Sequence, residues 1–265
     1  MPRKFCKMQG AGNDYIYFDC RREEFPNPSF YAKMLSDRRF GIGGDGIVLL
    51  LPDEEADIKM RMFNADGSEG KMCGNAVRCI GRFLFDESGK TCYTVNTGSG
   101  VKTVTAEKDG TFTVNMGQYD LSPRAIPSLL EGEAIDYPFQ NHLITCLSMG
   151  NPHCVLFEDP SFADLPKLAR EVEESGLFPE GVNLEVASIL GGAVFMRVFE
   201  RGSGETLSCG TGACAVGVAA YLTGRTREKQ LLIRCKGGWL KTKMTDDGVL
   251  LNGPAVAVYT GEITL

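Results

Sequence analysis

Histidine is scarce in this chain of 265 residues, which contains two, His142 and His153, beside ten cysteines. No two cysteines have the Cys-x-x-Cys spacing of a structural zinc site, so the sequence predicts that no metal is bound. The N-terminus also lacks the apolar stretch of an export signal, and cysteines that are not exported remain reduced. We therefore expect a cytoplasmic protein with free thiols.

Long apolar segments and an excess of positive charge are missing as well. The longest apolar run, Ile47–Leu51, has the length of a strand, whereas a membrane span needs ~18 apolar residues. The net charge is −6, and an acidic chain is repelled by nucleic acid and by anionic membranes. The sequence thus predicts neither nucleic acid nor a membrane as a partner and leaves small molecules as the expected ligands.

What the sequence does contain is a second copy of part of itself. When the chain is shifted by 136 positions, residues 58–81 lie on residues 194–217 without a gap, and Cys73 matches Cys209. Weaker matches continue in the same order at shifts of 137 to 139, as small loop insertions would produce. Collinear matches on both sides of the strong segment indicate a duplicated domain.

Each copy is predicted to combine short strands with one principal helix, because β-branched and aromatic residues cluster between Gly and Asp boundaries. The strand candidates of the first half are Tyr15–Phe18, Ile47–Leu51, Ile58–Phe63, Thr91–Asn96, Val101–Ala106 and Thr111–Met116. The helices are expected from about Asn75 to Phe85 and from about Gly212 to Leu222.

The expected fold class is α+β, with two pseudo-symmetric, duplicated mixed α/β domains. Each domain would be a curved, mainly antiparallel sheet around a central helix, and the active site would lie in the cleft between the domains. We place the domains at 1–118 and 119–265, because the stretch around the boundary is rich in proline. The strand-like tail after Pro254 could pair back with the N-terminal half.

Each half has a cysteine at a glycine-marked junction between a strand and its helix, in Met72-Cys-Gly-Asn-Ala and in Ser208-Cys-Gly-Thr-Gly. The unpaired N–H groups and partial positive charge at a helix N-terminus lower the pKa of a thiol and bind carboxylates. Two such ends could hold the α-carboxylate of an amino acid with its α-carbon between the sulfurs of Cys73 and Cys209. One thiolate would remove the α-proton while the other thiol delivers a proton to the opposite face. The alternative is that both cysteines are buried structural thiols that survived the duplication.

Several longer motifs fall in order along the two halves. They are Gly12-Asn-Asp-Tyr, Phe63-Asn-Ala-Asp-Gly-Ser, Met72-Cys-Gly-Asn-Ala-Val-Arg, Gly150-Asn-Pro-His, Gly181-Val-Asn, Glu200-Arg-Gly-Ser-Gly-Glu-Thr and Cys209-Gly-Thr-Gly-Ala-Cys-Ala. Through these motifs the sequence resembles the diaminopimelate epimerase family from end to end. The resemblance implies interconversion of LL- and meso-diaminopimelate for lysine and peptidoglycan supply, without pyridoxal phosphate or metal, by a protein that is usually a homodimer.

The resemblance also implies a role for individual positions. Cys73 and Cys209 would be the acid/base pair. The reacting carboxylate would be held by Gly74, Asn75, Gly210 and Thr211, and the ammonium groups and distal carboxylate by Asn13, Asn64, Asn151, Asn183, Glu200 and Arg201. His153 and Glu200 would tune the thiol pKa values, because an imidazolium favours a thiolate and a carboxylate disfavours it. His153 could instead be a hydrogen-bonded structural residue, and Gly46 stands where some relatives have a glutamine.

Two other functions stay open. Another two-cysteine racemase, acting on histidine, proline or hydroxyproline, would have the same acid/base pair. The Glu200-Arg201 pair and the series of asparagines favour a substrate with a second amino-acid head, which proline lacks. A non-catalytic amino-acid-binding module would bind its ligand without solvent exchange at the α-carbon.

Overall fold

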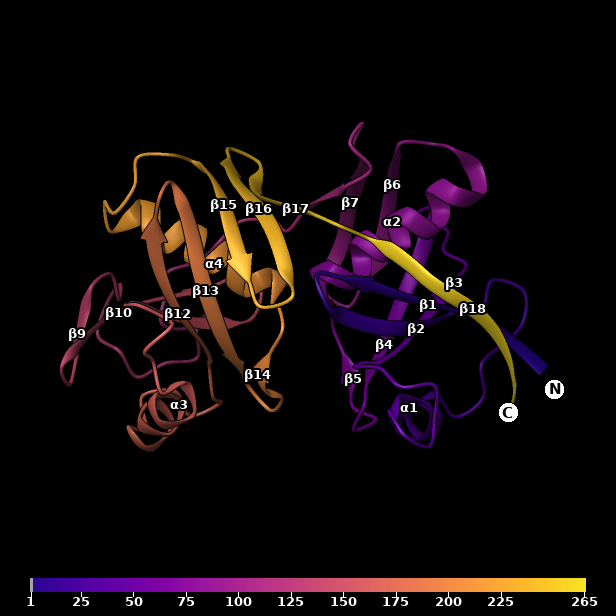
Figure 1. Cartoon of the computed structure of the whole chain (residues 1–265), viewed down its shortest axis with the longest axis horizontal. Helices are drawn as coiled ribbons and strands as arrows, with labels where there is room; N and C mark the ends of the chain where they lie inside the picture. The colour runs from indigo at the N-terminus through magenta and orange to yellow at the C-terminus, as the bar shows by residue number, and fades with distance from the viewer. Residues whose placement is uncertain (1) are drawn as a thin grey trace. The chain divides into compact units, whose positions relative to one another are not determined.

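The computed structural model describes residues 2–265, which form two compact units (Figure 1). Unit 1 comprises the chain up to Val114 together with Gly253–Leu265, and unit 2 comprises Asn115–Asn252. From the sequence, we divide the domains after residue 118 and expect that the C-terminal strand could pair with the N-terminal half. In the structure that strand, β18 (Val256–Thr264), pairs antiparallel with β1 (Pro2–Gly10), so the two ends of the chain belong to one unit. None of the described helices is long and apolar enough to cross a membrane.

Unit 1 is a mixed sheet with two helices. After β1 come β2 (Asn13–Asp19), α1 (Pro28–Ser36), β3 (Gly46–Leu51), β4 (Ile58–Asn64), β5 (Glu69–Gly70), α2 (Gly74–Ser88), β6 (Cys92–Thr97), β7 (Gly100–Ala106) and β8 (Phe112–Asn115). Neighbouring strands are antiparallel except for β2–β3 and β4–β6. Because parallel neighbours need a crossover, a helix lies in each of these two connections, α1 in the first and α2 in the second.

Unit 2 repeats this order element by element. Its elements are β9 (Tyr137–Phe139), β10 (His142–Ser148), β11 (Pro152–Phe157), α3 (Leu165–Glu174), β12 (Asn183–Leu190), β13 (Ala193–Glu200), β14 (Gly204–Thr206), α4 (Gly210–Leu222), β15 (Gln230–Cys235), β16 (Gly238–Thr245) and β17 (Gly248–Gly253). The parallel pairs are β11–β12 and β13–β15, with α3 and α4 in their connections. Strand β9 lies beside β10 as β18 lies beside β1. The predicted duplicated α/β fold is confirmed.

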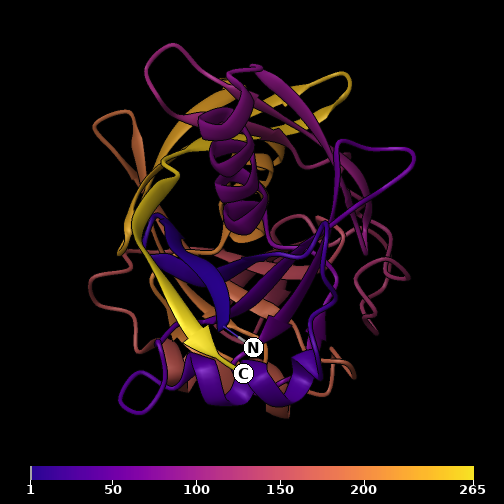
Figure 2. The ribbon, with the colours of Figure 1, turned by 90° about the vertical axis from the view of Figure 1, so that its right-hand side faces the viewer.

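The second helix of each unit is its central element. In Figure 2 the strands of unit 1 curve around α2, which packs against β1, β2, β6, β7 and β18. Helix α4 packs in the same way against β10, β11, β12, β15 and β16, and residues 210–220 are all buried. A helix enclosed on all sides must be small, and this explains the Gly- and Ala-rich sequence of α4.

A glycine at the same position of each central helix permits the close approach of a strand. A Cβ atom on Gly81 would lie 2.5 Å from Cγ2 of Val104, and one on Gly217 would lie 2.6 Å from Oγ1 of Thr242. Both distances are shorter than van der Waals contact, so neither helix has room for a side chain at this point.

We predict that Gly81→Ala lowers the free energy of unfolding, because the added methyl group overpacks α2 against β7. Overpacking costs about 1–3 kcal/mol, against a gain of ~1 kcal/mol in helix propensity. Urea denaturation of Gly81→Ala, Val104→Ala and the double variant measures this effect. The double variant should lose less stability than the sum of the losses in the two single variants, because Val104→Ala makes room for the added methyl group. Additive losses would contradict the close contact between Gly81 and Val104.

Candidate active site

Cys73 and Cys209 occupy the same structural position, directly before the central helix of their unit. Each is the N-cap of its helix and has an extended backbone, with φ −136° and ψ 121° at Cys73 and φ −118° and ψ 119° at Cys209. Helices α2 and α4 begin at Gly74 and Gly210, slightly earlier than predicted. The first N–H groups of both helices, including those of Gly74 and Gly210, are therefore beside the sulfurs and form a potential carboxylate site.

Cys209 is 6% exposed and accepts a hydrogen bond from the first turn of α4. Its Sγ lies 3.3 Å from the Gly212 N–H group, which donates to it, and 3.3 Å from Oγ1 of Thr211. These contacts lower the pKa of the thiol, but burial and the carboxylates of Glu200 and Glu185 outweigh them and raise it well above the usual range. The expected net lowering of the Cys209 pKa is thus wrong, because the expectation left out desolvation and the two acidic neighbours.

Cys73 is half-buried and has a different hydrogen bond. Its Sγ lies 3.3 Å from Oδ1 of Asn13, and since a carbonyl oxygen can only accept, the sulfur donates. Nδ2 of Asn13 donates to Oδ2 of Asp45 at 2.6 Å, and this contact determines which end of the amide faces the sulfur. Cys73 is thus a hydrogen-bond donor in this contact, whereas Cys209 accepts from the Gly212 N–H group.

Asp45 is a site residue that the sequence analysis missed. Beside the Asn13 amide, its Oδ2 accepts from the backbone N–H of Asp14 at 3.1 Å, and its Oδ1 pairs with Arg38 at 3.0 Å. Arg38 also pairs with Asp14 at 2.6 Å. The loop before β3 therefore holds Asn13 through a network of charges. Its glycine-rich sequence is typical of a turn, and the acidic residue inside it was the signal that could have been used.

The other predicted site residues of unit 1 lie at strand and helix ends. Asn64 is the last residue of β4, pairs in register with Gly46 and donates to Oγ of Ser68 at 3.0 Å. A Cβ atom on Gly46 would lie 2.1 Å from the carbonyl oxygen of Phe63, so a side chain has no room at this position.

Asn75 is almost completely buried in the first turn of α2. Its exposed fraction is 1%, and its Oδ1 accepts from Nη2 of Arg78 at 2.8 Å. The side chain is thus turned toward the interior of unit 1. What Asn75 offers to a ligand at the helix N-terminus is its backbone N–H group.

Asn183 and Arg201 are joined in unit 2. Asn183 is buried at the start of β12, where its Nδ2 donates to the carbonyl of Pro152 at 2.8 Å and its Oδ1 accepts from the backbone N–H of Arg201 at 3.0 Å. Its amide therefore braces the turn that carries Arg201. The Arg201 guanidinium is exposed and donates to the carbonyl of Glu180 at 2.7 Å. Glu200, at the end of β13, accepts from Oγ1 of Thr206 at 2.5 Å.

His153 is fully buried at the start of β11 and has a partner that the sequence analysis did not single out. Its Nδ1 lies 2.8 Å from Oε1 of Glu185, and its Nε2 lies 3.2 Å from Oδ1 of Asn151. Glu185 is also fully buried, and burial raises the pKa of its carboxyl while His153 lowers it. An acidic residue in the middle of the apolar strand Leu184–Ala187 was the sequence signal for this pair.

The predicted site residues thus fall into two groups, one in each unit. Unit 1 contains Asn13, Asn64, Cys73, Gly74 and Asn75, and unit 2 contains Asn151, His153, Asn183, Glu200, Arg201, Cys209, Gly210 and Thr211. Among residues 2–265, no group of three or more His, Cys, Asp or Glu side chains is arranged to hold a metal ion.

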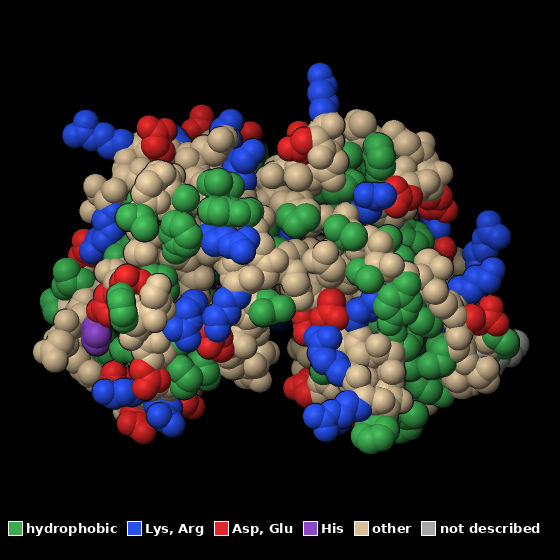
Figure 3. Space-filling model, in the orientation of Figure 1, with side chains coloured by type: hydrophobic (Ala, Val, Ile, Leu, Met, Phe, Trp, Pro, Cys, Tyr) green, Lys and Arg blue, Asp and Glu red, His purple; other side chains and the backbone are tan. Residues whose placement is uncertain are grey.

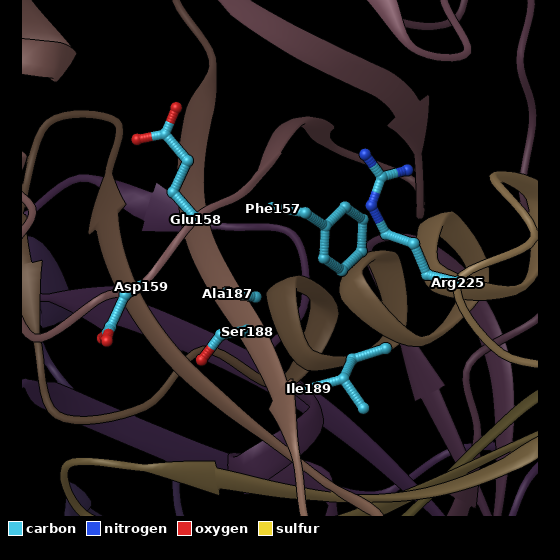
Figure 4. A pocket seen from close by; sticks show the side chains of 7 residues that line it. All are labelled: Phe157, Glu158, Asp159, Ala187, Ser188, Ile189 and Arg225. Atoms are coloured by element: carbon cyan, nitrogen blue, oxygen red, sulfur yellow. The ribbon is translucent and has the colours of Figure 1, made fainter.

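A cavity of about 410 Å³ lies elsewhere in unit 2 (Figure 4). It is lined by Phe157, Glu158, Asp159, Ala187, Ser188, Ile189 and Arg225. None of these is a predicted site residue, and the Arg225 guanidinium lies over the Phe157 ring and pairs with Asp136. The cavity is therefore separate from the cysteine position.

Comparison with known proteins connects this arrangement with one family. A sequence model of the diaminopimelate epimerase family matches residues 5–122 and 145–265. The diaminopimelate epimerase of Acetivibrio thermocellus is 43% identical, over 99% of this chain and 99% of its own. That of Desulfovibrio desulfuricans is 44% identical, over 98% of this chain and 97% of its own. A third, from Methanococcus maripaludis, is 41% identical over 99% of this chain and 100% of its own.

Solved structures with the same fold have low sequence identity. A phenazine biosynthesis protein of the PhzF family from Bacillus anthracis has a TM-score of 0.73 at 15% identity, with 100% of both chains covered. A hydroxyproline epimerase from Agrobacterium vitis has a TM-score of 0.67 at 15% identity, over 99% of this chain and 92% of that one. At such identities these structures establish the duplicated fold alone.

We predict that Glu200→Gln lowers the pKa of Cys209, because the carboxylate of Glu200 raises it. At neutral pH the thiolate fraction then increases, and alkylation of Cys209 by iodoacetamide becomes several-fold faster. Peptide mass spectrometry across a pH series separates Cys209 from the other nine cysteines. Glu228→Gln, at an exposed position of the same unit, is the control. An unchanged or higher midpoint in Glu200→Gln would show that this carboxylate does not act on the thiol.

Proposed function

The chain belongs to the diaminopimelate epimerase family, and we propose that it inverts an α-carbon of diaminopimelate with Cys73 and Cys209 as its acid/base pair. Its activity is that of an isomerase that interconverts LL- and meso-diaminopimelate, as part of lysine and peptidoglycan supply. The observation that carries the two-cysteine proposal is that both sulfurs cap equivalent helices of a duplicated fold.

The chemistry requires both sulfurs to reach one α-carbon from opposite faces, and this pairing is part of the proposal. The α-carboxylate would bind the N–H groups at the starts of α2 and α4. Negative charge develops on that carboxylate as the α-proton leaves, and N–H groups already directed at it stabilise the charge without reorganisation. An acid and a base of the same kind serve the reaction in both directions.

The hydrogen bonds of the two sulfurs suggest how the first proton moves. For one epimer Cys209 would be the base, and its sulfur would take the α-proton; the Gly212 N–H group stabilises the thiolate, and the raised pKa of Cys209 makes that thiolate a strong base. Cys73, which donates to Asn13, would be the acid and deliver its own proton to the opposite face. For the other epimer the roles exchange, so each turnover leaves one thiol and one thiolate.

The second amino-acid head of the substrate would be bound by the polar groups that surround the cysteines. The exposed guanidinium of Arg201 suits the distal carboxylate, which it can bind through two parallel hydrogen bonds. The carboxylate of Glu200 suits an ammonium group. Asn13, Asn64 and Asn151 would add hydrogen bonds, while Asn183 would act through its hold on Arg201.

We further propose that the enzyme works in the cytoplasm as a homodimer. Removal of the α-proton by a thiolate and delivery of another proton by a thiol require both cysteines to stay reduced, which a reducing compartment ensures. Strand β18 has apolar side chains that remain exposed, with Val256 at 41%, Val258 at 54% and Tyr259 at 45% (Figure 3). An apolar row of this kind on one strand is typical of a surface that a second subunit covers.

The acid/base proposal predicts that Cys73→Ala and Cys209→Ala each lose inversion by about 10²–10⁴-fold or more, because each removes one proton carrier. LL-diaminopimelate is incubated in heavy water, and inversion and deuterium at the α-carbon are followed by NMR and mass spectrometry. Cys92→Ala, at an exposed cysteine of unit 1, is the control and should keep its activity. Substantial inversion by either active-site variant would rule out the two-base scheme.

The homodimer proposal predicts that Val258→Asp weakens association by about 100-fold or more, since an unpaired charge buried in an interface costs several kcal/mol and every 1.4 kcal/mol is tenfold. Sedimentation velocity from nanomolar to micromolar concentration measures the shift toward monomer. Val101→Asp, at a valine of β7 that is 50% exposed, is the matched control. Equal sedimentation of the two variants would place the interface elsewhere.

A further inference from the structure

Cys209 has a buried carboxylate behind it that the reaction as described does not use. Glu185 lies in the middle of β12 with no exposed surface. A Cβ atom built on Gly212, in the first turn of α4, would lie 2.5 Å from Oε1 of Glu185 and 3.2 Å from Cβ of Cys209. The carboxylate is therefore packed against the first turn of the helix that Cys209 caps.

The duplicated unit shows that the fold does not require an acid at this position. Strand register makes Glu185 equivalent to Val48. In the parallel pair of unit 2, Val155 lies opposite Glu185, and in the parallel pair of unit 1, Tyr17 lies opposite Val48; each partner lies two residues after the first residue pair of its ladder. The same alignment makes Gly212 equivalent to Ala76. Unit 1 thus has an alanine and a valine at the positions where unit 2 has a glycine and a glutamate, and the missing methyl group of Gly212 makes room for the Glu185 carboxylate.

Burying Glu185 is unfavourable in itself. Its Oε2 has no hydrogen-bond partner among the described residues, and an unsatisfied buried oxygen costs stability. A valine, as in unit 1, would remove this cost. The acid therefore destabilises the unit, and its contribution must come from what it does to its neighbour.

That neighbour is His153. Its Nδ1 faces Oε1 of Glu185 at 2.8 Å and its Nε2 faces Oδ1 of Asn151 at 3.2 Å. The contact with Glu185 fixes the orientation of the ring, with Nδ1 toward β12 and Nε2 toward Asn151.

We propose that Glu185 is a positioning residue for the half-reaction at Cys209, acting by fixing the orientation of the His153 ring beside the first turn of α4. The proposal rests on the proposed function, in which Cys209 transfers a proton. It makes the two halves of the active site unequal, because Tyr15 and Val48 stand in unit 1 where His153 and Glu185 stand in unit 2.

This inequality has a consequence for solvent exchange. If only the transfer at Cys209 is slowed, the epimer whose α-proton faces Cys73 still loses that proton at the normal rate. Cys73 then returns a solvent deuteron to the same face before Cys209 delivers one to the other. That epimer gains deuterium without inverting, whereas the epimer that faces Cys209 does not.

The test uses Glu185→Gln, which keeps the shape of the side chain and removes its charge. In heavy water we expect one of the two epimers, and not the other, to exchange faster than it inverts. We also expect kcat to fall by about 10-fold or more with KM within about threefold, as for other carboxylates that orient a histidine. Glu158→Gln is the matched control, because Glu158 pairs with the chain's other histidine, His142, at the surface of the same unit.

A second variant separates positioning from packing. Glu185→Val combined with Gly212→Ala copies the Val48 and Ala76 pair of unit 1, and it should fold with a Tm at or above that of the unmodified protein. We expect it to show the same one-sided exchange. Inversion at the unmodified rate in this folded variant, or equal exchange-to-inversion ratios for both epimers in Glu185→Gln, would overturn the inference.

The proposed function fails in a different way. If Cys209→Ala retains inversion, the two-base scheme is wrong whatever the Glu185 variants do. If Cys209→Ala is inactive while Glu185→Gln behaves like Glu158→Gln, the acid/base pair stands and only the role of Glu185 is lost.

Discussion

The cap of a buried helix is the constraint on which this structure depends. In each unit the chain leaves the sheet, passes one cysteine and enters a helix that the strands enclose. Because the helix is buried, its first N–H groups can be satisfied only by the cap, by a ligand or by neighbouring side chains. The glycines after each cysteine follow from the same constraint, since they leave the N–H groups open to a carboxylate.

The duplication gives both cysteines the same backbone position but different chemical surroundings. Around Cys73 the equivalent strand positions are occupied by Tyr15, Val48 and Asn64, and around Cys209 by His153, Glu185 and Glu200. Burial together with the carboxylates of Glu200 and Glu185 raises the pKa of Cys209. A reaction that removes a proton at one face and adds one at the other needs two similar groups in opposite protonation states. Unequal surroundings favour such a division before the substrate arrives.

Much of the fold could be predicted because the strand patterns and the internal repeat can both be read directly from the sequence. Strands such as β3 and β4 are runs of apolar and β-branched residues, and the repeat at a shift of 136 positions needs no structure to be seen. Helix α1 was not predicted, because its short sequence Pro28–Ser36 has only a few buried residues and its cap, Asn27, lacks a side-chain hydrogen bond. The pairing of β18 with β1 joins the ends of the chain, and no local pattern encodes such a distant contact.

The sequence alone determined that two cysteines hold equivalent positions at helix starts, because repetition and glycine-marked junctions are properties of the chain itself. Only the tertiary structure decided what surrounds each sulfur. Asp45 reaches the Cys73 group through the Asn13 amide, and Glu185 reaches the Cys209 group through a cross-strand contact with His153. The direction of the pKa shift at Cys209 also depends on these contacts, since desolvation and charge act through space. A one-dimensional pattern can place a thiol at a helix end, but it does not show how deeply the fold buries that thiol or which charges it places beside it.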